Sequence, residues 1–268
     1  MKKGFTLIEL LVVISIIALL LAIMMPALAS ARLGALTLVC KNNIHQLLLA
    51  NISYASENNG CFVPAASDML YGPGLYRWHG TRDNLNEPFD SSRGPLSGYL
   101  ANSKVKECPA KVDFVNNQDW NTNFEQGCGG YGYNMTYIGS RLWQSGLKTE
   151  KDWIDAYAKT TRPEEIRKPA QTLMFSDTAI ANDGESLIEY SFAEPPFAVQ
   201  NGTPVTSFYM SPSIHFRHRN NANIGWADGH AGNREIAVFD NTNAYGVKSS
   251  DLELGWFSPI DNSLFDLK

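Results

Sequence analysis

One apolar segment near the N-terminus constrains this 268-residue chain more than any other feature. From Leu10 to Ala31 the sequence contains no Asp, Glu, Lys or Arg, and the run LLVVISIIALLLAIMM is apolar apart from Ser15. A helix over residues 5–25 would be about 30 Å long at 1.5 Å per residue, which matches the hydrocarbon thickness of a bilayer. The segment therefore predicts a helix that crosses a lipid bilayer.

The charges at its two ends predict its orientation. Lys2 and Lys3 precede the apolar run, and the next positive charge is Arg32. Because positive flanks stay on the cytoplasmic side, we expect a single-pass protein of the inner membrane with a cytoplasmic N-terminus and a periplasmic or extracellular remainder. A secretory signal peptide cut near residues 27–29 is the alternative, since Ala-Leu-Ala there resembles a cleavage site.

Glu9 argues against an ordinary signal peptide. Its carboxylate lies near the start of the apolar run, and a charge at mid-membrane costs about 2.5–3.5 kcal/mol on insertion scales. We therefore expect Glu9 to have a cationic partner or to lie near the membrane interface, as in an uncleaved signal anchor.

The sequence KKGFTLIELL at residues 2–11 resembles the processing signal of type IV prepilins and type II secretion pseudopilins. The resemblance implies that prepilin peptidase cuts between Gly4 and Phe5 and that the new amine of Phe5 is methylated. It also implies that Glu9 pairs with such an amine during assembly with other pilin-like subunits on an inner-membrane assembly platform. The product would be a filament.

The helix is expected to continue beyond the membrane. Pro26 cannot donate an intrahelical hydrogen bond and should kink it. An apolar stripe of helical period then follows at Leu36, Cys40, Ile44, Leu47 and Leu48, and Asn58-Asn59-Gly60 predicts the end of the helix.

We expect four regions: a leader at 1–4, a transmembrane helix at 5–30, its exposed continuation at 31–60, and a globular head at 61–268. The head is rich in Gly, Asn, Pro and aromatic residues with short strand-like runs, which predicts an α+β, pilin-like fold with an antiparallel sheet and long loops. Expected strands are residues 172–176, 206–209, 214–218, 223–228 and 236–239, with a short helix at 148–160.

The segment from His218 to His230, HRNNANIGWADGH, carries the strongest pattern in the head. It resembles the C-terminal H-x9-DG segment, here 218–229, of prepilin-like proteins from planctomycete and lentisphaera type bacteria. Residues 40–47, Cys108-Pro109 and residues 131–134 also resemble that group. We expect His218 and Asp228 to lie across from each other in a hairpin, with Gly229 in a positive-φ turn. A metal site of His218, Asp228 and His230 is the open alternative.

Other sites have weaker support. Asp119-x-Asn121-x-Asn123 begins like a calcium loop, but Phe124 and Gly130 replace the required Gly and Glu. We expect no cofactor, with calcium or another metal left open. An enzymatic reading would combine Ser176 or Asp177 with one of the histidines, but no G-x-S-x-G, H-E-x-x-H or phosphate loop occurs. We therefore expect no enzyme.

The four cysteines lack the spacing of a zinc motif. We expect a disulfide between Cys108 and Cys128, which enclose nineteen residues of exported loop, and a buried thiol at Cys40. Cys61 is too far along the helix from Cys40 for a bridge. The net charge of −5 offers no basic surface, so no nucleic acid is expected.

These features predict a prepilin-like structural subunit. Whether it serves a type II secretion pseudopilus or a type IV pilus-like filament stays open, as do its cargo and its place as a major or minor subunit. The alternative of another class is a signal-anchored extracytoplasmic binding or hydrolytic protein that does not assemble.

Overall fold

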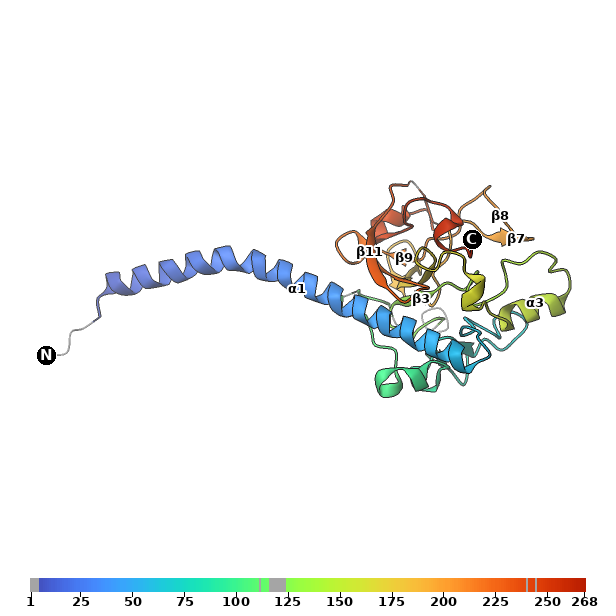
Figure 1. Ribbon diagram of the computed structural model, residues 1–268. Helices are drawn as coiled ribbons and strands as arrows, with labels where there is room; N and C mark the ends of the chain where they lie inside the picture. The colour runs from blue at the N-terminus through green and yellow to red at the C-terminus, as the bar shows by residue number, and fades with distance from the viewer. Residues whose placement is uncertain (1–4, 111, 116–123, 240, 244) are drawn as a thin grey trace.

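The computed structural model describes residues 5–110, 112–115, 124–239, 241–243 and 245–268. It consists of one long helix whose C-terminal half packs against a head of short strands and loops (Figure 1). The predicted α+β, pilin-like arrangement is confirmed.

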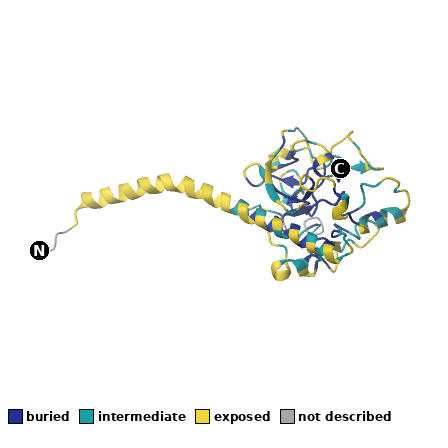
Figure 2. Ribbon diagram, in the orientation of Figure 1, coloured by how far each residue is buried: buried dark blue, intermediate teal, exposed yellow. Residues whose placement is uncertain are grey.

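Helix α1 runs from Leu7 to Glu57. The described residues from 5 to 35 are all exposed, and Figure 2 shows this half of the helix extending away from the head. By length and composition α1 is apolar and long enough to cross a membrane. Pro26 lies inside the helix, which continues through it and bends along its free half (Figure 1).

The second half of α1 serves the head. Its buried residues follow the predicted stripe and are Cys40, Asn43, Ile44, Leu47, Leu48, Ala50, Asn51 and Ala55. The helix ends where Asn58-Asn59-Gly60 predicted. Asn59 and Gly60 both have positive φ, and the Gly60 amide donates to the Ala55 carbonyl over 2.9 Å. Asn and Gly tolerate this left-handed conformation better than other residues do, so they end the helix here.

The largest sheet has four antiparallel strands in the order β11-β10-β4-β3. Their bounds are β3 Tyr131–Tyr133, β4 Leu173–Asp177, β10 Asn221–Trp226 and β11 Ala231–Glu235. Helix α1 packs on this sheet, mainly over β10. Gly225 permits the close approach, because a Cβ atom there would lie 2.6 Å from Ile44 and 2.8 Å from Leu48.

Four two-stranded ladders, a second α-helix and six short 3₁₀ helices complete the regular structure of the described residues. The 3₁₀ helices are η1 Ser91–Arg93, η2 Ser97–Tyr99, η3 Ala101–Ser103, η4 Pro163–Glu165, η5 Ser249–Leu252 and η6 Asn262–Leu264. The ladders are β1 Tyr76–Arg77 with β2 Gly80–Thr81, β5 Ile180–Ala181 with β6 Leu187–Ile188, β7 Val199–Gln200 with β8 Thr203–Pro204, and β9 Ile214–His215 with β12 Leu254–Gly255; the helix is α3, Glu150–Ala158.

The expected strands at 172–176, 214–218 and 223–228 correspond to β4, β9 and β10, and the expected helix at 148–160 corresponds to α3. Two expectations are wrong. Residues 206–209 form turn and bend, and residues 236–239 lie beyond the end of β11. In the second segment Ile236 donates its amide to the Asn220 carbonyl and Ala237 to the Trp256 carbonyl. These apolar residues therefore pack on the core from irregular backbone.

Candidate functional site

The first candidate site is the N-terminus of α1. Thr6 caps the helix: its hydroxyl accepts from the Glu9 amide over 3.3 Å, and the Glu9 carboxylate accepts from the Thr6 amide over 2.9 Å and from its hydroxyl over 2.7 Å. This reciprocal capping box holds the Glu9 carboxylate against the start of the helix. Gly4, the predicted cleavage residue, lies outside the described residues.

The capping box places an anion one residue from the predicted new terminus. The amide of Phe5 directly precedes that of Thr6, and the Phe5 side chain is 71% exposed. A positively charged amine at Phe5 would add to the partial positive charge of the helix N-terminus. The Glu9 carboxylate thus lies at the end of the helix that would carry such an amine.

The second candidate site surrounds His218, where the head meets α1. Arg219 and Asn220 both have positive φ, and His218 and Asn221 exchange backbone hydrogen bonds of 3.0 and 3.2 Å. This is a two-residue turn of the type I′ kind, which Asn favours. The turn lies just before β10 and directs the His218 side chain toward α1, where Nδ1 lies 3.3 Å from the Thr37 hydroxyl.

His218 reaches an acidic and sulfur-rich cluster. Its Nε2 lies 3.3 Å from Asp177 Oδ2 and 3.6 Å from Cys108 Sγ, and Cys40 Sγ lies 3.6 Å from Asp177 Oδ1. Cys40 and Asp177 are fully buried, His218 is nearly so, and Cys108 is half-buried. We call these four residues the His218 cluster.

Neighbouring side chains hold the His218 cluster in place. Asp177 Oδ2 accepts from the backbone amide of Asn223 over 2.7 Å and from its side-chain amide over 3.1 Å. The Tyr131 hydroxyl lies 3.2 Å from Cys40 Sγ and accepts from the Asn43 amide over 3.1 Å. Burial, with Asp177 nearby, raises the pKa of Tyr131, so its hydroxyl stays protonated.

The predicted disulfide between Cys108 and Cys128 is wrong. Cys108 is bonded to Cys40, with Cα atoms 5.3 Å apart, and Cys128 is a buried free thiol. The expected buried thiol at Cys40 is also wrong, because Cys40 forms this disulfide. The physical reason is that α1 docks with Cys40 facing the loop before β3, a proximity that spacing along the chain does not reveal. Cys61 is free.

His218 and Asp228 do not face each other, because the hairpin partner of β10 is β11, which follows it. The six residues of β10 separate the two side chains by about 20 Å of strand. Asp228 instead accepts from His230 Nδ1 over 2.6 Å in the β10–β11 turn, where Gly229 has the expected positive φ. The predicted metal set of His218, Asp228 and His230 is therefore not assembled.

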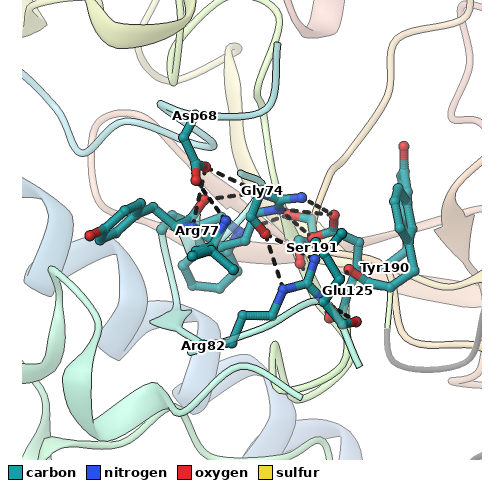
Figure 3. Close-up of polar contacts among 12 residues, drawn as sticks. Asp68, Gly74, Arg77, Arg82, Glu125, Tyr190 and Ser191 are labelled. Atoms are coloured by element: carbon teal, nitrogen blue, oxygen red, sulfur yellow. Dashed lines mark hydrogen bonds and ion pairs between the residues drawn. The ribbon is translucent and has the colours of Figure 1, made fainter. Parts of the chain in front are cut away.

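A third cluster is a buried ion pair. Arg77 donates two bonds of 2.8 and 2.7 Å to the Glu125 carboxylate, and both side chains are at most 2% exposed. Figure 3 shows Arg77 between Glu125 and Asp68, with Arg82 bonded to the Gly74 carbonyl. These bonds join β1 to the segment before β3. The charges are neutralised by one another, as in a structural pair.

The calcium-like pattern at residues 119–123, which the sequence already argued against, lies outside the described residues. Sequence reasoning named Asp177 only in the enzymatic alternative and His218 mainly in the H-x9-DG segment, and it missed their junction with Cys40 and Cys108. The available signal was that residues 40–47, Cys108-Pro109, residues 131–134 and His218 all belonged to one resemblance.

Comparison with known proteins yields one finding. Residues 1–25 match the family model of the prokaryotic N-terminal methylation motif. No curated protein and no solved structure matches the chain. The motif and the apolar helix that follows it support a membrane-anchored, prepilin-like protein, and they point to a structural subunit rather than an enzyme.

Proposed function

We propose that this chain is a subunit of a type II secretion pseudopilus or type IV pilus-like filament. Prepilin peptidase cuts it between Gly4 and Phe5, and the Phe5 amine is methylated. The mature protein then crosses the inner membrane once, with its head on the outer side, until it joins the filament. The match of residues 1–25 to the N-terminal methylation motif carries this proposal.

The shape of the molecule supports it. The free half of α1 exposes large apolar side chains, such as Leu7, Ile8 and Leu28 at 84%, 75% and 71%. An apolar surface of this extent needs lipid or other apolar surfaces around it. A bilayer supplies them before assembly, and the helices of neighbouring subunits supply them afterwards. Toward the head this half reaches Ser30, whose hydroxyl and carbonyl accept from Arg219.

Glu9 then acts as the register of assembly. In the precursor its carboxylate is satisfied by Thr6. Cleavage creates an amine at Phe5, one residue before Thr6. A carboxylate and an ammonium group attract each other strongly in a low-dielectric membrane. A subunit entering the filament gains most where its Glu9 meets the Phe5 amine of a neighbour, so only one axial position is favoured.

Two measurements test the proposal. N-terminal mass spectrometry of the membrane-extracted protein, with and without prepilin peptidase, should give a chain that starts at methylated Phe5 only when the peptidase is present. An intact Met1 or a cut near Ala29 would overturn processing and favour a signal-anchored binding or hydrolytic protein.

The second measurement concerns assembly. Glu9→Ala should be processed normally but should lose filament incorporation, measured by crosslinking between subunits and by recovery of sheared filaments. Ser15→Ala is the matched control in the same apolar run, because the Ser15 hydroxyl donates to the Val12 carbonyl of its own helix. Equal incorporation of both variants would contradict the role of Glu9.

A further inference from the structure

The His218 cluster brings together four metal-ligating side chains from four distant parts of the chain. Cys40 comes from α1, Cys108 from a loop, Asp177 from the end of β4, and His218 from the turn before β10. Their ligand atoms all lie within 4.8 Å of one another. We propose that reduced Cys40 and Cys108, together with Asp177 and His218, bind one divalent ion of the zinc type, so that disulfide and metal are alternative occupants of one site.

The spacing of the ligand atoms fits a tetrahedral ion. Bonds of about 2.0–2.3 Å to nitrogen, oxygen and sulfur place neighbouring ligand atoms roughly 3.3–3.8 Å apart. The distance from His218 Nε2 to Asp177 is 3.3 Å, that from His218 Nε2 to Cys108 Sγ is 3.6 Å, and that from Cys40 Sγ to Asp177 is 3.6 Å. The two bonded sulfur atoms are closer than an ion requires, and reduction frees them to separate.

The chemistry of the donors selects the kind of ion. Two thiolates, one imidazole and one carboxylate suit zinc, which accepts mixed sulfur, nitrogen and oxygen ligands in tetrahedral sites. Calcium and magnesium prefer oxygen ligands in larger number, and this cluster offers a single carboxylate. The site is therefore distinct from the calcium loop considered above.

The surrounding bonds orient the ligands independently of the disulfide. Thr37 engages His218 Nδ1, which turns Nε2 toward the cluster. Asn223 fixes the Asp177 carboxylate through two hydrogen bonds. Such outer contacts position ligands and set their basicity in metal sites. The half-buried Cys108 gives an ion a way in from solvent.

Charge balance also permits the ion. Three anionic ligands and a divalent cation leave one negative charge, and the partly buried Arg217 interacts electrostatically with Asp177. Arg217 is held beside the site by bonds to the carbonyls of Gly130 and Thr178. A residual anion at this position therefore has a fixed counter-charge.

The exchange between the disulfide and the bound ion conserves atoms and electrons in both directions. A small-molecule dithiol reduces the disulfide to two thiols and is itself oxidised to a disulfide. Binding of the ion then displaces two thiol protons to solvent. In the opposite direction, a disulfide oxidant accepts two electrons from the two sulfur atoms, which bond to each other and release the ion. Neither step depends on filament assembly.

The test uses the full chain in detergent, oxidised or reduced, with zinc competition against a chromophoric chelator. The reduced protein should bind one equivalent of zinc and the oxidised protein none above background. Cobalt(II) should give thiolate charge-transfer absorption with the reduced protein only. His218→Ala and Asp177→Asn should each weaken zinc binding by at least roughly tenfold. Loss of a residue that merely positions a ligand already costs about that much, and these two residues are the ligands themselves.

Three control variants sharpen the result. Asp228→Asn, whose carboxylate lies at the far end of β10, and Cys61→Ser and Cys128→Ser, which lack the two free thiols, should bind zinc as the unmodified chain does. Equal zinc binding by a Cys40→Ser/Cys108→Ser variant, or cobalt binding without thiolate absorption, would overturn the proposal. Near-ultraviolet circular dichroism reports on folding: a reduced chain that loses its signal and recovers it with zinc supports the site, and one that does not recover contradicts it.

Discussion

Removing the disulfide between Cys40 and Cys108 should have a large and diagnostic effect on stability. The bond closes a loop with a sequence separation of 68 residues. In the chain-entropy model a loop of that length stabilises the folded state by about 4 kcal/mol at 25 °C. The whole free energy of unfolding of a domain is about 5–15 kcal/mol. Loss of this bond alone should therefore remove a large fraction of the free energy of unfolding of the head.

The assay is urea denaturation of the full chain in detergent without metal, followed by tryptophan fluorescence, since Trp78 and Trp256 are fully buried. Cys40→Ser and Cys108→Ser should each lower the free energy of unfolding by about 4 kcal/mol, and the double variant should lose little more. This lack of additivity follows because either substitution breaks the same bond. Cys61→Ser, which replaces a free and partly exposed thiol, should change the free energy by at most about 0.5 kcal/mol.

The same variants distinguish the Cys40–Cys108 disulfide of the structure from the Cys108–Cys128 disulfide predicted from the sequence. If Cys108 were bonded to Cys128, Cys128→Ser would match Cys108→Ser in cost and Cys40→Ser would not. A non-reducing peptide map should contain a linked peptide with Cys40 and Cys108. A map with Cys108 linked to Cys128, or additive losses for Cys40→Ser and Cys108→Ser, would refute the reasoning.

Two further predictions concern buried charges in the head. Burial raises the pKa of Glu194 from its usual 4.5 to about 7, so the folded state keeps a proton that the unfolded state releases. Stability should fall as pH rises from about 4.5 to about 7, by on the order of 3 kcal/mol relative to Glu194→Gln in parallel urea titrations, and a constant difference would contradict the shift. Arg77→Met should lower the free energy of unfolding by about 3–5 kcal/mol, because it leaves Glu125 buried and unpaired. Arg93→Met, which breaks only exposed pairs, should cost about 0–1 kcal/mol in the same urea assay, and equal losses would contradict the distinction.

The features that could be predicted from the sequence are those with local causes. The apolar run, the stripe of α1 and the stop at Asn58-Asn59-Gly60 depend on neighbours along the helix, and each is present as expected. Strands β4 and β10 carry a clear apolar pattern. Residues 236–239 carry one too, but the backbone amides of Ile236 and Ala237 donate to loop carbonyls, so the predicted strand is wrong there.

The His218 cluster could not be predicted in the same way, because its members meet through tertiary packing. Cys40 and Cys108 approach only after α1 docks on β10, an approach that Gly225 permits. His218 points at α1 because two positive-φ residues reverse the chain before β10. The H-x9-DG spacing suggested that its two ends meet, whereas β10 holds them apart.

The His218 cluster lies among the contacts that fix the head on α1. The Cys40–Cys108 bond, the His218–Thr37 contact and the bonds from Arg219 to Ser30 join the head to successive turns of α1, just beyond its free half. A filament that packs helices in its centre and carries heads outside requires a fixed angle between the two parts. Because α1 continues without a break from Glu9 to Cys40, contacts that fix the head on the helix also fix it relative to the carboxylate that we propose sets the register. The position of the His218 cluster, between the free half of α1 and the sheet, therefore suits a contact that sets the angle between head and helix.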